Sequence, residues 1–187
     1  MPAIKPMRIP GPWRQGYVLD YHTLSSHFVG HDEFGNPMFD TKRTQIGELV
    51  YQLKYRRNPK ALAAVVELAN SFVQRWNPKV DAIVPVPATR TRAVQPVIQL
   101  ATGLGKRLRL PVLTALIRTR NKPKELKDVF DYNERIKLLE GAYAIRDQTV
   151  RGKAVLLVDD LYRSGAPLNA ISRVLYDQGG CSNVFAL

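Results

Sequence analysis

Cysteine is almost absent from this sequence, which contains a single one, Cys181, among 187 residues. One cysteine excludes an internal disulfide and any multi-cysteine zinc site. Because Cys181 lies near an expected last strand, its position favours packing in the core over redox chemistry.

Long hydrophobic runs are also missing. No apolar run approaches the roughly 18 to 20 residues that a membrane span requires, and the first residues, MPAIKPMRIPGPW, lack the apolar region of a signal peptide. These absences predict a cytoplasmic protein with no membrane partner. Hydrophobic residues nevertheless make up 45% of the chain, which is enough for a sizeable core.

Acidic residues are scarce relative to basic ones. Asp and Glu number 16 against 28 Lys and Arg, which gives a formal net charge of +12. This surplus favours a polyanionic ligand, either a phosphorylated metabolite or a nucleic acid. Charge alone does not choose between these two classes.

The apolar residues that are present follow two periods. Segments 44–57 and 61–76 have helical spacing, and short apolar runs at 81–85, 154–158 and 184–187 then alternate with further helical patterns. Strands alternating with helices predict an α/β fold, a mainly parallel sheet flanked by helices. We expect the three runs to lie side by side as parallel strands. Residues 110–119 and 141–147 are expected as further strands, and the helix after the first run to be interrupted at Pro96 and Gly103.

The first 43 residues differ from the rest. Four prolines among the first twelve residues indicate an extended arm, and the stretches 16–30 and 36–41 predict a β-hairpin. We therefore divide the chain into an N-terminal arm with a small hairpin appendage, 1–43, and an α/β domain, 44–187.

This appendage also contains clustered histidines and aromatic residues. The histidines are close in sequence, but their spacing matches no zinc motif. The aromatic side chains suit either stacking on nucleic-acid bases or packing of the hairpin. The residues concerned are His22, His27 and His31, and Trp13, Tyr17 and Tyr21.

Two adjacent carboxylates, Asp159 and Asp160, directly follow the apolar run 154–158. Ligands bind at the carboxyl ends of parallel strands, and the loop 164–167 leads into a helix whose first N–H groups favour an anion. Carboxylates repel phosphate, so a ligand that uses both features must also offer hydroxyls or a divalent cation. A sugar phosphate meets this requirement. The alternative is that the acids are turn residues and the loop is a helix cap.

The segment VLLVDDLYRSGAPLNAISRVL resembles the phosphoribosyl pyrophosphate (PRPP) binding motif of type I phosphoribosyltransferases. The segments LVYQLKYRR, IVPVPATRTRAVQPVIQLA and LIRTRNKPKELKDVFDYNERIKLLEGAYAI are similar in order and spacing to the ComF-like (competence protein F-like) branch of that family. The resemblance implies a type I phosphoribosyltransferase-like, Rossmann-like fold, with Mg²⁺ as cofactor. It also implies transfer of ribose phosphate from PRPP to a nitrogen nucleophile, with release of pyrophosphate.

The resemblance assigns roles to four groups of residues. Asp159 and Asp160 would be the catalytic residues, which hold the ribose hydroxyls and, through PRPP, Mg²⁺. The remaining groups are the 5′-phosphate loop (Arg163, Ser164, Gly165, Ala166 and Pro167), the pyrophosphate loop (Pro87, Ala88, Arg90 and Arg92) and the flexible hood (Arg118, Arg120 and Lys122). The alternative for the arginines and the hood is a solvated surface.

The chain departs from the family at several positions. Pro167 stands where the family has a threonine, and proline offers phosphate neither a hydroxyl nor an N–H. Arg163 stands where purine-salvage members often carry an aspartate, which argues against purine salvage. The branch's RGFNQ signature and its four-cysteine zinc ribbon are also absent.

The partners expected from this interpretation are PRPP or another ribose 5-phosphate ligand, and it allows a homodimer. A rival hypothesis keeps the fold without catalysis and uses the basic surface to bind single-stranded nucleic acid. A third is a scaffold without a ligand. The sequence identifies neither the acceptor nor the pathway.

Overall fold

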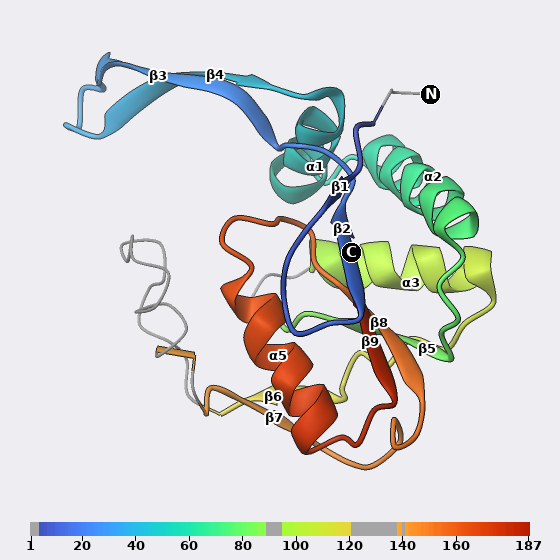
Figure 1. Cartoon of the computed structure of the whole chain (residues 1–187). Coiled ribbons are helices and arrows are strands. Elements are labelled where there is room, and N and C mark those ends of the chain that lie inside the picture. The colour runs from blue at the N-terminus through green and yellow to red at the C-terminus, as the bar shows by residue number, and fades with distance from the viewer. Residues whose placement is uncertain (1–3, 89–94, 121–137, 140) are drawn as a thin grey trace.

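The computed structural model of the chain describes residues 4–88, 95–120, 138–139 and 141–187. Its helices are α1 (Gln45–Arg56), α2 (Pro59–Trp76), α3 (Pro96–Leu108) and α5 (Ala166–Asp177). Its strands are β1 (Met7–Arg8), β2 (Gln15–Val18), β3 (Thr23–His31), β4 (Pro37–Arg43), β5 (Ala82–Pro85), β6 (Ile117–Thr119), β7 (Tyr143–Ile145), β8 (Ala154–Val158) and β9 (Asn183–Ala186). Figure 1 shows how these elements are arranged.

Five strands form the main sheet, in the order β1-β2-β9-β8-β5. Strands β2, β9, β8 and β5 run parallel, and only β1 is antiparallel to its neighbour. The expected parallel neighbours are confirmed, because β8 pairs with β5 on one side and with β9 on the other. The α/β fold class predicted from the sequence is also confirmed.

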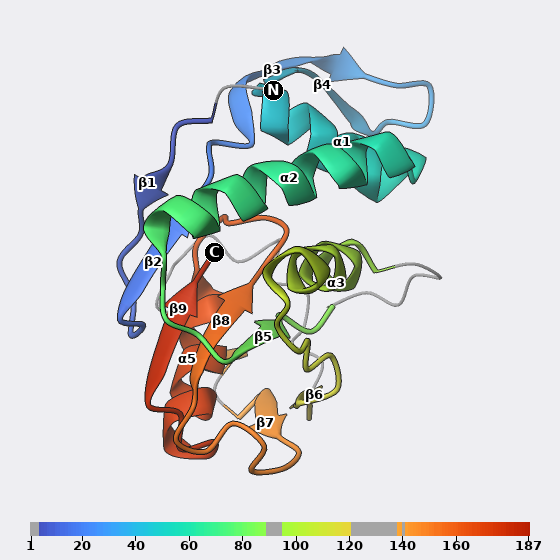
Figure 2. The same ribbon diagram turned by 90° about the vertical axis from the view of Figure 1, so that its right-hand side faces the viewer.

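Helices cover both faces of this sheet (Figure 2). On one face, Leu156 and Phe185 pack in a cluster with residues of α2 and α3. On the other, Leu157 and Val184 pack in a cluster with residues of α5. Successive strand residues therefore point to opposite sides, and both sides are apolar because both are buried.

The helix ends follow local sequence signals. Thr44 caps α1 and Asn58 caps α2 through their side-chain oxygens. Pro96 begins α3 instead of interrupting it, because the N–H that proline lacks has no helical partner in a first turn. Gly103 does not interrupt α3 either. A Cβ atom there would clash with Val66, so the glycine permits close packing of α3 on α2.

The N-terminal region differs from the expected hairpin. β2 lies in the main sheet beside β9, and the hairpin consists of β3 and β4 alone. The Tyr17 ring of β2 contacts Phe72 and Trp76 edge-on, with centroids 5.3 and 5.0 Å away. Trp13 is buried and donates a hydrogen bond to the Ile9 carbonyl. Trp13 and Tyr17 therefore serve packing, not base stacking, and the division of the chain at residue 43 stays a prediction.

The strand expected over 110–119 is shorter than predicted. Only Val112 forms a bridge to Ile83 of the main sheet. β6 instead pairs antiparallel with β7 in a separate two-stranded sheet. The turn from Leu113 to Leu116 separates these two pairings.

Cys181 is buried, as expected for a core cysteine, and burial raises the pKa of its thiol to about 11. None of the helices in the described part of the chain is long and apolar enough to cross a membrane.

Candidate functional site

Asp159 and Asp160 lie where β8 ends, and the backbone fixes both. The Asp159 N–H donates to the Leu187 carbonyl at 2.9 Å, which holds this turn against the end of β9. The Asp160 N–H donates to the Asp159 carboxylate at 2.8 Å. Both residues are partly buried. The two carboxylates thus stand at the carboxyl edge of a parallel sheet, as the sequence predicts.

The pKa of Asp159 is raised to about 7, first by burial and then by the neighbouring charge of Asp160. The hydrogen bond from the Asp160 N–H and the charge of Lys54 act in the opposite direction. A carboxyl group with this pKa gains and loses a proton near neutral pH. Burial of an ionisable acid beside a second acid costs stability, and such arrangements concentrate at functional sites.

Lys54 of α1 supplies a cation to this acid pair. Its ammonium nitrogen lies 2.8 Å from Asp160 Oδ1, and each of the two side chains is only 15% exposed. Lys54 is not among the site residues predicted from the sequence. Its place within LVYQLKYRR, on a helix about a hundred residues before the acids, was the only available signal.

A cavity of about 230 Å³ opens beside the acid pair. It lies at the ends of β5 and β8 and at the start of α5, where the ligand is expected. Its described lining residues are Lys54, Val86, Pro87, Ala88, Gln95, Pro96, Val97, Asp159, Asp160, Leu161 and Pro167.

A second cavity, of about 370 Å³, also reaches the acids, and its walls are mostly apolar. Residues of α1, α2 and α3 line it together with the segment that follows β2. This segment arrives at the acid edge because β2 runs parallel to β9. Asp159, Asp160 and Leu161 line both cavities, so the acid pair lies between them.

His22 lies in the segment after β2 and lines the apolar cavity. Its pKa is lowered, first by burial and then by the positive charges of Lys54 and Arg43. The imidazole is therefore neutral at neutral pH and able to accept a proton. Among the residues that the structure describes, no group of three or more His, Cys, Asp or Glu side chains could hold a metal ion. His27 and His31 lie on β3, whereas His22 lies before that strand.

The loop expected to hold the 5′-phosphate precedes α5. Gly165 has a φ of 71°, which favours glycine, and the Tyr162 ring leaves no room for a side chain there. The Ser164 hydroxyl accepts a 3.4 Å hydrogen bond from the Ala166 N–H. Of this loop, Pro167 lines the 230 Å³ cavity, whereas the Arg163 side chain is exposed.

The other predicted site residues are only partly brought together. Pro87 and Ala88 line the 230 Å³ cavity. Arg118 in β6 and Arg120 just after it are exposed, and neither is among the described residues that line the two cavities. The remaining three, Arg90, Arg92 and Lys122, lie outside the described residues.

No family model matches this chain. Among curated proteins, it is similar to competence protein ComFC of Bacillus subtilis (strain 168), with 26% identity over 145 residues. The match covers 77% of this chain and 59% of ComFC, so the chain spans about three fifths of that relative's length.

Two solved structures are similar at lower identity. Adenine phosphoribosyltransferase from Saccharomyces cerevisiae is 15% identical, with a TM-score of 0.49 over 88% of this chain and 85% of that one. Glutamine PRPP amidotransferase from B. subtilis is 16% identical, with a TM-score of 0.47 over 82% and 34%. The sequence match to ComFC confirms the resemblance to the ComF-like branch, because the chain is similar to that competence protein over 77% of its own length.

Proposed function

We propose that this protein is a phosphoribosyltransferase that binds PRPP with Mg²⁺ and transfers the ribose phosphate to a nitrogen nucleophile. The observation that carries the proposal is the acid pair, which is partly buried at the carboxyl edge of the sheet between two cavities. Burial beside a second acid raises the pKa of Asp159 to about 7, which destabilises the folded chain when the carboxyl group is ionised. Residues that only form a turn gain nothing from this cost, whereas such costs are typical of functional sites. A cytoplasmic location stays part of the proposal.

The 230 Å³ cavity suits the ribose and its phosphates. Asp159 and Asp160 accept hydrogen bonds from the ribose hydroxyls, and Pro167 places the start of α5 beside the 5′-phosphate. Lys54 contributes positive charge where the pyrophosphate group leaves. The bond from the anomeric carbon to pyrophosphate breaks as the bond to the acceptor nitrogen forms.

The donor set fits Mg²⁺ that arrives with the ligand. Two carboxylates are hard oxygen ligands, and Mg²⁺ is usually held by one or two carboxylates together with substrate phosphates and water. Asp159 and Asp160 would hold the ion, with Lys54 beside them. When bound, the ion would supply positive charge to the departing pyrophosphate.

The 370 Å³ cavity suits the acceptor, because it lies on the other side of the acid pair and is large enough for a small molecule. Its apolar walls favour an acceptor with a largely apolar body. The nitrogen nucleophile must lose a proton as the new bond forms. His22, which is neutral at neutral pH and lines this cavity, is the base that we assign to that proton.

The test is isothermal titration with PRPP and Mg²⁺. Wild-type protein should bind, whereas the double variant Asp159→Asn/Asp160→Asn should fold, as judged by circular dichroism, and fail to bind. A matched double variant, Asp147→Asn/Asp177→Asn, removes the same charge from exposed positions and should bind as wild type does. Unchanged binding by the acid-pair variant, or no binding by wild type, would reject the proposal.

A second candidate function is single-stranded nucleic-acid binding without catalysis. The net charge of +12 and the similarity to a competence protein favour it. A fluorescently labelled oligonucleotide, titrated at two salt concentrations, tests it separately from PRPP binding.

A further inference from the structure

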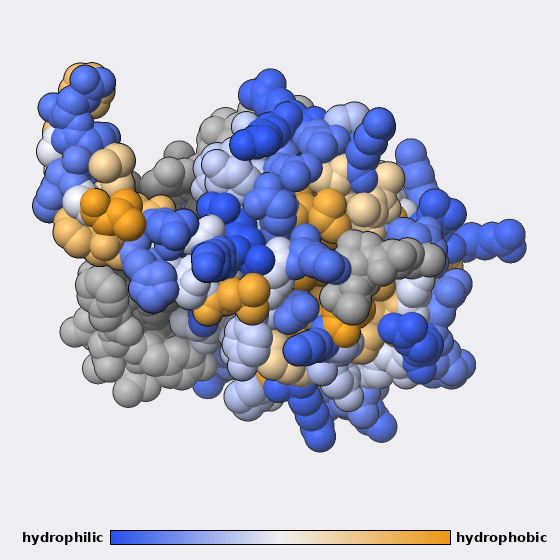
Figure 3. All heavy atoms as spheres, turned by 90° about the horizontal axis from the view of Figure 1, so that it is seen from above, coloured by the Kyte–Doolittle hydropathy of each residue, from blue (hydrophilic) through white to orange (hydrophobic). Residues whose placement is uncertain are grey.

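The hairpin formed by β3 and β4 stands clear of the rest of the molecule (Figures 1 and 3). Its two strands form a sheet of their own, and no residue of either strand is buried. Nine large hydrophobic side chains are exposed in the described part of the chain, and six of them lie on this hairpin: Leu24, Phe28, Val29, Phe34, Met38 and Phe39. Exposed apolar groups gathered in this way mark an interaction surface.

Phe28 and Phe39 form the centre of this surface. They are directly opposite in the strand register, with ring centroids 5.8 Å apart, and both are more than half exposed. The His31 ring contacts Phe28 at 5.1 Å. An isolated two-stranded hairpin is only marginally stable in water, and both its outer edges offer unpaired backbone groups. The hairpin is therefore a candidate surface for a partner.

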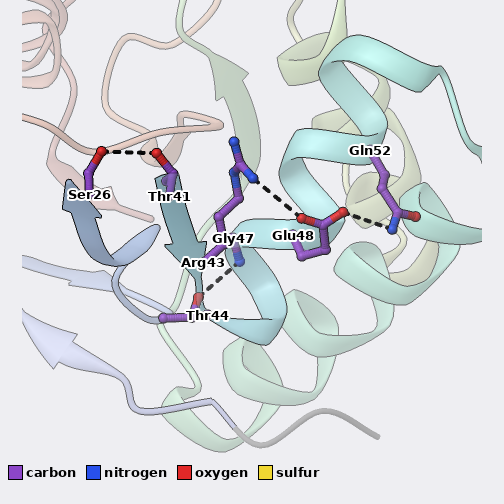
Figure 4. A network of polar contacts seen from close by, with 7 residues as sticks. All are labelled: Ser26, Thr41, Arg43, Thr44, Gly47, Glu48 and Gln52. Atoms are coloured by element: carbon purple, nitrogen blue, oxygen red, sulfur yellow. Dashed lines mark hydrogen bonds and ion pairs between the residues drawn. The ribbon is translucent and has the colours of Figure 1, made fainter. Parts of the chain in front are cut away.

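The root of the hairpin holds it in a fixed direction (Figure 4). Ser26 and Thr41 join the strands by a 2.9 Å hydrogen bond between their hydroxyls. Arg43 pairs with Glu48 of α1 at 3.7 Å, and its guanidinium lies 3.9 Å from the centre of the Tyr51 ring. An arm anchored in this way presents Phe28 and Phe39 to a partner with little loss of freedom on binding.

The charge of the outer part of the hairpin indicates the kind of partner. Residues 24–41 contain three acids, Asp32, Glu33 and Asp40, and no Lys or Arg, whereas the hairpin's two basic residues, Lys42 and Arg43, lie at its root. Outside residues 24–41 the chain has 28 basic side chains against 13 acids. An acidic surface is repelled by nucleic-acid phosphates and attracted by a strongly basic protein surface. The rest of this chain carries such a surplus of positive charge.

We propose that the β3–β4 hairpin is an arm through which two copies of this chain form a two-fold dimer, with the Phe28 and Phe39 face of each arm seated on the basic body of the other copy. A two-fold axis lets both arms engage at once, which doubles the contact. The proposal is independent of the function proposed for the acid pair.

Sedimentation velocity of the full chain tests it, over a range of protein concentrations. Wild type should reach twice the monomer mass of 21.1 kDa. The double variant Phe28→Ser/Phe39→Ser should raise the dimer dissociation constant about tenfold or more, because exposed aromatic anchors dominate such contacts. The control Tyr55→Ser removes an aromatic ring that is 65% exposed on α1 and should leave the dimer intact.

A charge reversal, Glu33→Lys/Asp40→Lys, removes neither ring and distinguishes two ways of pairing. If each arm seats on a basic body, the reversal should weaken the dimer, most strongly at low salt. The control Asp177→Lys, on α5, makes one such reversal away from the arm and should have no such effect. Thermal melting of each variant checks that it folds.

Several results would overturn the proposal. Wild type that stays monomeric at every concentration is one, and a dimer that survives the serine variant is another. A dimer strengthened by the charge reversal would mean that the arms pair with each other. Loss of oligonucleotide binding by the serine variant, with association unchanged, would assign the arm to nucleic acid.

Discussion

Replacing Asp159 by Asn should stabilise the folded protein at neutral pH although it removes a predicted ligand-binding group. The carboxyl pKa is raised from the ordinary 3.8 to about 7, first by burial and second by the charge of Asp160. At about 1.36 kcal/mol per pKa unit, this shift corresponds to roughly 4 kcal/mol of destabilisation when the group is ionised. Asn keeps the shape and can still accept the hydrogen bond from the Asp160 N–H.

The pH dependence gives this prediction its sign. Below pH 4 the carboxyl group is protonated in both the folded and the unfolded chain, so Asp159 and Asn should be nearly equivalent. As pH rises to about 7, the unfolded chain ionises first and wild type loses stability that the variant keeps. The difference in stability should therefore grow between pH 4 and 7 and stay constant above that range.

The gain in stability should be smaller than the full value of about 4 kcal/mol, because burial of the Asn amide has its own cost. We expect about half of that value, roughly 2 kcal/mol. For a chain of this length, this corresponds to a rise in Tm of about 4 to 8 °C at pH 8. Thermal melting by circular dichroism at pH 4, 6 and 8, without ligand, measures it.

Asp147→Asn is the matched control. The pKa of Asp147 is lowered by hydrogen bonds from Thr149, so the same substitution should reduce stability at neutral pH instead of raising it. A lower Tm for Asp159→Asn at pH 8, or an equal change at all three pH values, would show that burial and the charge of Asp160 do not destabilise the ionised Asp159 carboxylate.

Three further predictions concern the proposed ligand site and the charges of the chain. Lys54→Met should lower the free energy of unfolding, measured by urea denaturation, by about 1–3 kcal/mol, a value between those for exposed and for buried ion pairs. The control Arg107→Met breaks the more exposed pair with Glu67 and should cost less than about 1 kcal/mol. Pro167→Thr restores a hydroxyl and an N–H at the start of α5, so affinity for PRPP in calorimetric titration should rise about tenfold; equal affinity would mean that this loop holds no phosphate. Oligonucleotide binding measured by anisotropy should weaken steeply with salt, and also when four basic residues are replaced together by Gln: Arg118, Arg120, Lys122 and Lys124. Salt-independent binding would contradict the electrostatic origin of that interaction.

The sequence predicted the centre of the sheet because its signals there are local. β5 and β8 are unbroken apolar runs, and an uninterrupted run between helical segments is typical of a parallel strand buried on both faces. The acid pair could be placed for the same reason, since it follows β8 directly. The prediction that Pro96 interrupts a helix was wrong, because proline occurs both where helices break and in their first turn. The sequence does not distinguish these two positions, whereas the structure shows that Pro96 begins α3.

The rest of the site depends on contacts between distant residues. β2 has the short, mixed sequence QGYV, and its place beside β9 comes from pairing across about 170 residues and from the packing of Tyr17. That pairing delivers His22 to the acid edge. Lys54 similarly reaches Asp160 only because α1 packs over this edge. Neither the β2–β9 pairing nor the Lys54–Asp160 contact leaves a periodic signal in the sequence.

Thr44 joins the hairpin, the segment after β2 and α1, and its replacement by Val should therefore affect the proposed ligand site indirectly. Its buried hydroxyl donates to the Tyr21 carbonyl and accepts from the Gly47 N–H at 3.0 Å. Loss of this helix cap should cost about 1–2 kcal/mol. The same hydroxyl holds the start of α1 beside Tyr21, the residue before His22. Thr44→Val should therefore also weaken PRPP binding severalfold, although Thr44 is not among the residues proposed to contact the ligand.

Asn58→Ala separates positioning from stability in this prediction. Asn58 caps α2 with its side chain and also donates a hydrogen bond to Gln52 of α1. Its loss should cost a similar amount of stability, but Asn58 has no bond to the segment after β2. Urea denaturation gives the free energy of unfolding for both variants, and calorimetry gives their affinity for PRPP. Equal affinities in the two variants would show that Thr44 serves the fold alone. A loss confined to Thr44→Val would mean that this junction positions His22 and α1 for the ligand.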